Sequence, residues 1–237
     1  MKAHLMGIAA AALAVLVPSI AGAQQQEIQP SEKTYTQQGL PAPAQAFEAT
    51  VGTGYTQGFG MFRSGVGMPQ VAHEGIGVDA SAGYRIDPHW ALSIGGEYQE
   101  LNATNASAAR GATATIAAQF HMAPTIRLDP WVELGSGYRA LWLIPSTNIE
   151  ATALTHGWQI ARARLGFDLR VSPDIAVAPV IGADATMFLW QDVSGNNAAI
   201  PSPAVSTFVF AGVQGRLDIG GNKVGTTTVT SSSPTYE

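Results

Sequence analysis

The nonapeptide YRIDPHWAL occupies residues 84–92, and two variants of it recur as IRLDPWVEL at 126–134 and LRVSPDIAV at 169–177. Each copy has Arg, an aliphatic residue, Asp or Ser, and Pro, followed by an alternating apolar run. Asp or Ser before Pro favours a tight turn, because Pro fixes φ and the preceding side chain bonds back to the backbone. The flanking segments alternate with period two, which is typical of strands. Each copy therefore predicts a β-hairpin.

The alternation also predicts the register of each hairpin, since a slip of one residue would turn every apolar side chain to the wrong face. Three-residue loops are a common hairpin class. We therefore expect Ile86 opposite Trp90, Leu128 opposite Val132 and Val171 opposite Ile175. The predicted turn residues are Asp87, Pro88, Asp129, Pro130, Ser172 and Pro173.

Three hairpins supply six strands, and the segments 46–60 and 206–220 add one strand at each end. The longer connections between hairpins fall at 61–74, 101–110, 145–156 and 191–204. An even strand count, with short turns at one end and longer loops at the other, is typical of an up-and-down membrane barrel. We predict an all-β fold, an eight-stranded antiparallel up-and-down transmembrane β-barrel over residues 46–220.

The regions outside the barrel have different compositions. Residues 1–23 have a short polar start, an apolar stretch and an Ala-Gly-Ala cleavage site, which predicts a cleaved signal peptide and export. Residues 24–45 and 221–237 are rich in Gln, Pro, Ser and Thr and have too little apolar surface to fold alone. We expect 24–45 to be a disordered periplasmic segment and 221–237 a disordered tail.

Charged side chains share one face of the predicted strands. They are Glu48, Asp79, Arg85, Glu97, Arg127, Glu133, Arg139, Arg162, Arg164, Asp168, Arg170, Asp184, Arg216 and Asp218. Every base among them is Arg, whose planar fork suits carboxylate pairing in a desolvated interior better than Lys does. The opposite face is apolar. This polarity predicts a membrane barrel with charges inside; a soluble, lipocalin-like periplasmic carrier of an apolar ligand is the alternative.

The alternating strands, the three Arg-x-Asp/Ser-Pro turns and the signal peptide resemble the small eight-stranded outer-membrane barrels, the OmpA-like and opacity-like group. The resemblance covers residues 46–220 and implies a location in the cell outer membrane. One departure is the last strand, which ends in Arg216-Leu217-Asp218-Ile219 without the aromatic residue common in that group. No C-terminal peptidoglycan-binding domain is expected, since few residues follow the barrel.

The charged face supports two interpretations. Eight strands enclose an interior that side chains just fill, so we expect an Arg/acid salt-bridge network and a structural or surface-interaction role. A narrow pore for small solutes is the alternative. The predicted register places Arg127 opposite Glu133 as a buried ion pair.

Other function classes have weaker support. No catalytic, cofactor or metal site is expected: the chain has no Cys, and His121 beside Gln119, His156 and Ser136 form no recognisable triad. A lipid-modifying enzyme of the outer membrane stays as a further alternative. The net charge of -5 argues against nucleic acid as a partner. We expect a monomer that contacts outer-membrane lipid and an unknown surface ligand through its four longer loops.

Overall fold

The computed structural model describes residues 40–104, 106–145 and 151–222. The predicted signal peptide, most of the segment 24–45 and the tail from residue 223 lie outside the described residues. None of the helices in the described part is long and apolar enough to cross a membrane.

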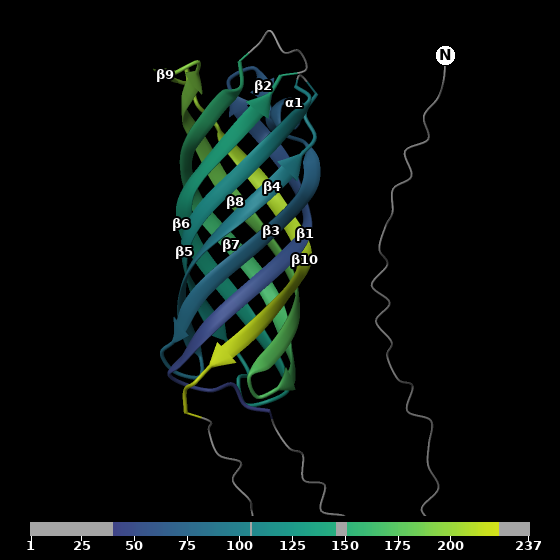
Figure 1. Ribbon diagram of the computed structural model, residues 1–237, viewed down its shortest axis with the longest axis vertical. Coiled ribbons are helices and arrows are strands. Elements are labelled where there is room, and N and C mark those ends of the chain that lie inside the picture. Colours follow the sequence, from purple (N-terminus) through teal and green to yellow (C-terminus); the bar gives the residue numbers. More distant parts are fainter. Residues whose placement is uncertain (1–39, 105, 146–150, 223–237) are drawn as a thin grey trace, which may run out of the picture. The chain divides into compact units, whose positions relative to one another are not determined.

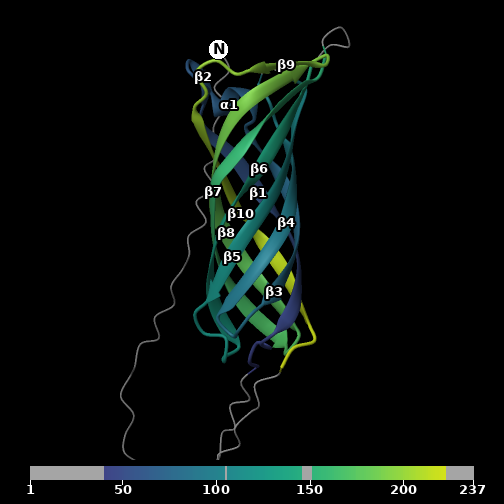
Figure 2. The same cartoon turned by 90° about the vertical axis from the view of Figure 1, so that its left-hand side faces the viewer.

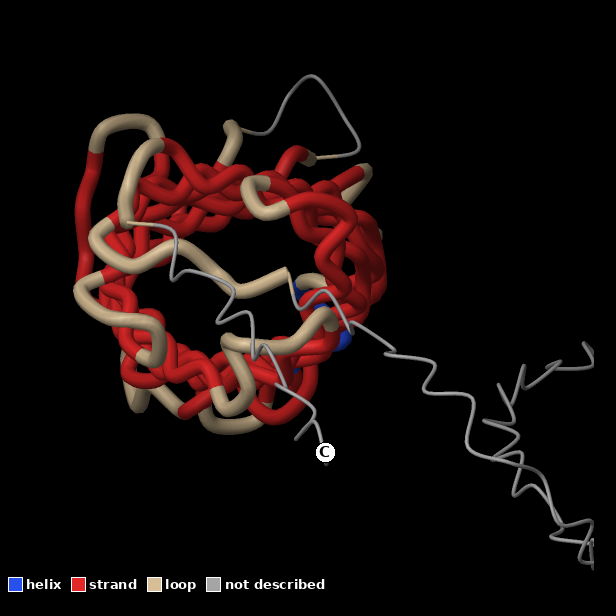
Figure 3. Tube along the Cα trace, turned by 90° about the horizontal axis from the view of Figure 1, so that it is seen from below, coloured by secondary structure: helices blue, strands red, loops and turns tan. Residues whose placement is uncertain are grey.

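Eight long antiparallel strands dominate the described residues and close into a barrel (Figures 1 and 3). They are β1 (Ala46–Arg63), β3 (Glu74–Arg85), β4 (Trp90–Leu101), β5 (Ala108–His121), β6 (Leu128–Ile144), β7 (Ala153–Ser172), β8 (Ile175–Val193) and β10 (Val205–Ile219). Each pairs with its neighbours in chain order, and β10 closes the ring by pairing with β1 from Phe47↔Ile219 to Gly60↔Ser206. The predicted fold class is confirmed.

The first and third repeats form the hairpin turns that the sequence predicts. Ile86 donates its N–H to the carbonyl of Trp90 at 2.8 Å, and the Asp87 carboxylate accepts the N–H groups of His89 and Trp90. In the third turn Leu169 pairs with Val177, as expected, but a bulge between Arg170 and Ser172 moves the last pair to Ser172↔Ile175.

The second repeat is a strand and not a turn, so the predicted turn at Asp129-Pro130 is wrong. The connection between β5 and β6 lies at 122–127, and β6 already contains Asp129, Pro130 and Trp131. His121 pairs with Trp131 and Phe120 with Val132. The physical reason is burial: Asp129 and Trp131 both point into the barrel and are almost fully buried there, where they find polar partners that an exposed turn would not offer.

Short elements cover one end of the barrel, which we call the loop end (Figures 1 and 2). They are β2 (Val66–Gly67), α1 (Met68–Val71) and β9 (Asn196–Ala199). An apolar cluster beneath them closes the barrel mouth; its fully buried members include Phe62, Met68, Leu141, Phe188 and Phe208.

The opposite end, which we call the turn end, carries the hairpin turns and both ends of the barrel chain. Residues 40–45 pack against it, although the sequence assigns them to the disordered segment. Ala42 donates its N–H to the carbonyl of Pro124 at 2.8 Å, and Ala44 and Asn222 exchange two backbone hydrogen bonds. Ala42 and Pro43 are buried.

The outer surface of the barrel is apolar and the inner surface is polar. Val51, Ile76 and Ile116 expose 65%, 67% and 69% of their surface. Most of the charged side chains of the strands are buried inside the barrel. A barrel of this polarity belongs in lipid, where closed sheets satisfy every backbone group internally, and the soluble-carrier alternative does not fit.

Candidate functional site

The barrel lumen contains thirteen of the fourteen charged residues assigned to it by the sequence pattern. Arg127 is the exception: it lies in the 122–127 connection, is exposed and donates its Nε–H to the Arg170 carbonyl at 3.1 Å. The predicted Arg127–Glu133 pair is therefore wrong, and its cause is the shifted second hairpin. Asp129 joins the lumen instead, so among the described residues eight carboxylates face six guanidinium groups.

The layer nearest the loop end joins the charges to the apolar cluster. Arg139 donates from Nη2 to Asp184 Oδ2 at 2.7 Å, and its guanidinium carbon lies 4.0 Å from the centre of the Phe208 ring. A cation over an aromatic face is stabilised by the ring quadrupole. Arg139 thus connects the network to the residues that close the barrel mouth.

Two guanidinium groups and three carboxylates meet in the middle of the lumen. Arg164 reaches Glu97 at 2.8 Å and Asp79 at 3.3 Å, and Arg162 reaches Glu133 at 3.4 Å. A cavity of about 20 Å³ lies in this layer, which is room for about one water molecule. Side chains therefore occupy most of this layer of the lumen.

The layer nearest the turn end holds further pairs. Arg85 donates to Glu48 at 2.6 Å, and Arg216 reaches Asp168 at 2.9 Å. Asp168 also accepts the indole N–H of Trp131 at 2.8 Å. The last pair, Arg170 with Asp218, joins β7 to β10 at 2.6 Å.

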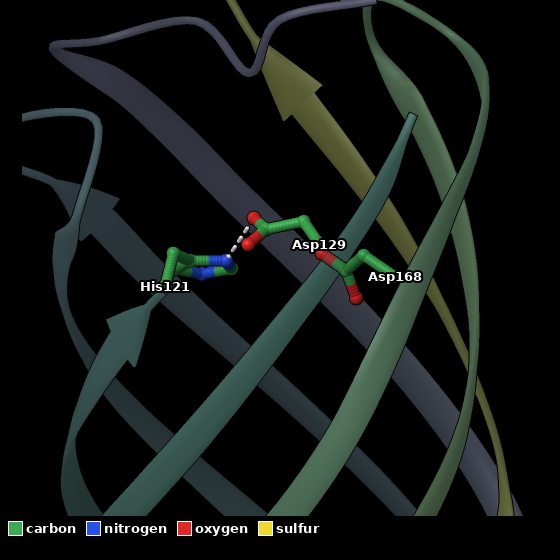
Figure 4. Close-up of side chains that lie close together, drawn as sticks. All are labelled: His121, Asp129 and Asp168. Atoms are coloured by element: carbon green, nitrogen blue, oxygen red, sulfur yellow. Dashed lines mark hydrogen bonds and ion pairs between the residues drawn. The ribbon is translucent and has the colours of Figure 1, made fainter. Parts of the chain in front are cut away.

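His121, Asp129 and Asp168 approach one another from β5, β6 and β7 (Figure 4). His121 Nδ1 lies 2.7 Å from Asp129 Oδ2. On the other side of the ring, Nε2 lies 2.8 Å from an Arg216 nitrogen and 3.1 Å from an Arg85 nitrogen. Because both guanidinium groups can only donate, the imidazole proton lies on Nδ1.

This trio is a poor metal site, even though its three residue types can all bind metals. Nε2 of His121 accepts from two guanidinium groups, and Asp168 is held by Arg216 and Trp131. A metal ion would have to displace these donors and would meet two positive charges. The trio therefore serves as a polar clamp that ties the β5–β6 connection into the lumen.

The residues that a lipid-modifying enzyme would need are not brought together. His156 bonds the Tyr138 hydroxyl and stacks on Trp190 at 5.6 Å. Ser136 donates its hydroxyl to the backbone carbonyl of Gln159 at 2.9 Å. His121 is in the lumen, where its ring is already bonded to charged groups. No nucleophile–base pair is formed by these three residues.

Sequence reasoning missed Asp129 and Trp131 as lumen residues because the Asp-Pro pair matches turn chemistry. One signal was available: Ala123-Pro124-Thr125 precedes it and also breaks a strand pattern. Pro124 and Pro130 lie six residues apart, so the sequence leaves two places for the hairpin turn, and burial of Trp131 decides between them.

No model of a known protein family and no curated protein matches the sequence. Solved structures do match. The outer membrane protein OprG from Pseudomonas aeruginosa is 10% identical with a TM-score of 0.50, over 75% of this chain and 98% of that chain. Neisserial surface protein A is 11% identical with a TM-score of 0.49, over 72% of this chain and 96% of that chain.

The chain has the fold of the small outer-membrane β-barrels. At such low identity the likeness extends to the fold alone. The apolar outer surface independently requires a membrane, and barrels of this type reside in the outer membrane with their longer loops outside the cell. By this rule we expect the loop end to be extracellular and the turn end to be periplasmic.

Proposed function

We propose that this outer-membrane barrel is a sealed, non-conducting scaffold that presents its extracellular loops to a surface partner and has no catalytic role. The observation that carries the proposal is the filled lumen. An apolar cluster lies at the extracellular end, three charged layers follow, and residues 40–45 pack against the periplasmic end.

The chemistry of the lumen opposes ion passage. An ion that crossed it would have to leave water at the Phe62–Phe208 cluster and then separate buried pairs such as Arg164–Glu97. Buried charges are costly to unpair, because the partner left behind is not solvated. The central cavity of about 20 Å³ is too small to supply a continuous water path. These features favour the sealed scaffold over the narrow pore.

The extracellular loops are the parts left to meet a partner. The proposed contact regions are the four connections 61–74, 101–110, 145–156 and 191–204. The last of these, residues 191–204, is largely exposed and has one charged residue, Asp192. Its strand β9, Asn196–Ala199, is exposed at every residue. Loops carried on a rigid barrel are the usual place for binding in such scaffolds.

Single-channel recording in planar bilayers tests the sealed lumen. The purified barrel, first shown to be folded by a shift in its gel mobility on boiling in SDS, should give no reproducible conductance steps at either polarity. A large porin in the same bilayers serves as the positive control. Uniform conductance steps from this barrel would overturn the proposal and support the narrow pore. Mass spectra of outer-membrane lipid from cells with and without the protein test the absence of catalysis; a lipid modified only in its presence would overturn that part.

A further inference from the structure

The outer face of β3, β4 and β5 carries a furrow that begins near the extracellular loops. A depression of about 590 Å³ is lined by Ile76, Val78, Tyr98 and Ala108. A second depression of about 470 Å³ shares Val78 and Tyr98 with it and continues to Gly96 and Ala112. The two depressions adjoin at one cross-strand row, Val78–Tyr98–Ala112, in which Ala112 has the smallest side chain.

Small outward-facing residues make the floor of this furrow. Gly96 pairs with Ala114 and with Ala80, and Ala112 pairs with Tyr98. A Cβ placed on Gly96 would meet one atom within 4 Å, the Thr113 carbonyl oxygen at 3.4 Å. The side above Gly96 is therefore open. In the adjoining row Tyr98 stands beside Ala112, so Ala112 is the low passage between the two depressions. A narrow apolar groove with this profile suits an alkyl chain.

A polar group marks the extracellular mouth of the furrow. Glu100 accepts a hydrogen bond from the Tyr98 hydroxyl at 3.0 Å, and Arg110 Nε lies 3.3 Å from the same carboxylate oxygen. Arg110 is half-exposed and faces outward from β5. Among the described residues, no hydrogen bond occupies its two terminal nitrogens.

The position of Arg110 along the barrel corresponds to the membrane interface. It pairs across strands with Trp142 on β6 and with Glu100 on β4. Aromatic residues at strand ends mark the level of lipid headgroups in membrane barrels. Arg110 therefore lies at headgroup level of the outer leaflet, with the apolar furrow beside it extending toward the membrane centre.

We propose that this furrow binds one phosphorylated, acylated lipid of the outer leaflet, with an acyl chain along Ala112 and Gly96 and a phosphate on Arg110. A guanidinium group presents two parallel donors to a phosphate, and such charge-assisted bonds are stronger than neutral ones. The acidic partner Glu100 holds Nε and leaves the terminal nitrogens for the anion. The site needs only the membrane orientation of the barrel and goes beyond the proposed scaffold role.

Native mass spectrometry of the refolded, lipid-free barrel tests the site. The probe is bisphosphorylated lipid A, titrated against the full chain in detergent, and its fully dephosphorylated form is the comparison. We expect one lipid A per barrel. Arg110→Ala and removal of the phosphates should each weaken binding by about tenfold, the loss expected for one charge-assisted contact.

Ala112→Leu fills the furrow floor and should also weaken binding. Ala183→Leu makes the same change at an outward-facing position on β8 and, as the control, should leave binding unchanged. Arg127→Ala removes an exposed Arg at the periplasmic end and should leave binding unchanged. The proposal is overturned if Arg110→Ala and Ala112→Leu bind lipid A as tightly as these two controls. Equal binding of the dephosphorylated lipid would overturn it as well, because Arg110 would then have no phosphate to recognise. Each variant is first run on a gel with and without boiling in SDS. Only variants whose mobility changes on boiling, as expected for a folded barrel, are compared.

Discussion

Trp131 donates its indole N–H to Asp168 across 2.8 Å inside the lumen, one strand away from its own. This bond requires Asp129-Pro130-Trp131 to be part of β6, with alternate side chains pointing inward. The bond also explains why the second copy of the repeat lies in a strand, whereas the first copy forms a turn. His89, at the corresponding place in the first copy, lies in a turn, whereas a Trp there gains more from burial with a hydrogen-bond partner.

Asp129 and Asp87 occupy the same place in two copies of the repeat but should differ in their effect on stability. Asp129→Ala leaves His121 Nδ1–H and the Ala123 N–H without an acceptor inside the barrel. We expect a loss of about 2–5 kcal/mol in the free energy of unfolding, because buried donors lose their solvation too. Asp87→Ala removes two bonds in an exposed turn and should cost about 1 kcal/mol. Urea unfolding in lipid vesicles measures both; equal losses would contradict the burial of Asp129.

Arg164 bridges two carboxylates in the middle of the lumen. Replacement by Met removes the ion-pair partner of Asp79 and the nearer of the two partners of Glu97, which keeps Arg162 at 3.7 Å. We expect a loss of about 3–5 kcal/mol, because breaking a buried pair leaves an uncompensated charge. Arg127→Met is the matched control, since Arg127 is exposed, and it should stay within about 0.5 kcal/mol of the parent. A large effect of Arg127→Met would instead support the Arg127–Glu133 pair inferred from sequence.

Met68 closes the extracellular mouth by packing among Phe62, Phe188 and Phe208. Met68→Ala should lower the free energy of unfolding by about 2–5 kcal/mol, the usual cost of emptying a buried site of this size. Conductance should stay absent, because the Arg139–Asp184 layer lies beneath the cluster. Met122→Ala, at an exposed position in the β5–β6 connection, is the control and should cost less than about 1 kcal/mol. Channel activity in Met68→Ala would show that the cluster alone seals the barrel.

The strands of this fold were predictable from the sequence. Alternation with a period of two indicates both that a segment is a strand and which face of the sheet each side chain occupies. Glu97, Arg164 and Asp184 alternate with outward apolar residues, so their inward orientation follows from the pattern alone. The first turn was predictable for a local reason: the Asp87 side chain bonds two backbone N–H groups within three residues.

Partner choice inside the lumen was not predictable, because it depends on strand tilt and stagger. Arg164 meets Glu97 although 67 residues separate them, and Arg139 meets Asp184 rather than an acid on its neighbouring strand. The prediction of a turn at Asp129-Pro130 was wrong because local turn chemistry there competes with burial of Trp131. That burial is a tertiary effect, which the repeat does not encode. The apolar cluster beneath the loop end depends on non-local packing of Phe62 with Phe188 in the same way.

Gly166 offers a direct test of the position of Trp131. A Cβ on Gly166 would lie 2.3 Å from Cζ2 of the Trp131 indole, whereas a Cβ on the outward-facing Gly215 would have only the Val51 carbonyl oxygen nearby, at 3.9 Å. Gly166→Ala should therefore lower the free energy of unfolding by about 1–3 kcal/mol through overpacking. Gly215→Ala should raise it by about 0.5–1 kcal/mol, since Ala loses less backbone entropy than Gly in a strand. Combining Gly166→Ala with Trp131→Leu should make the two losses less than additive, because the smaller side chain relieves the overlap. If the two losses in the free energy of unfolding, measured in urea, were strictly additive, Trp131 would not lie over Gly166. The inward orientation of the Trp131 side chain would then be wrong.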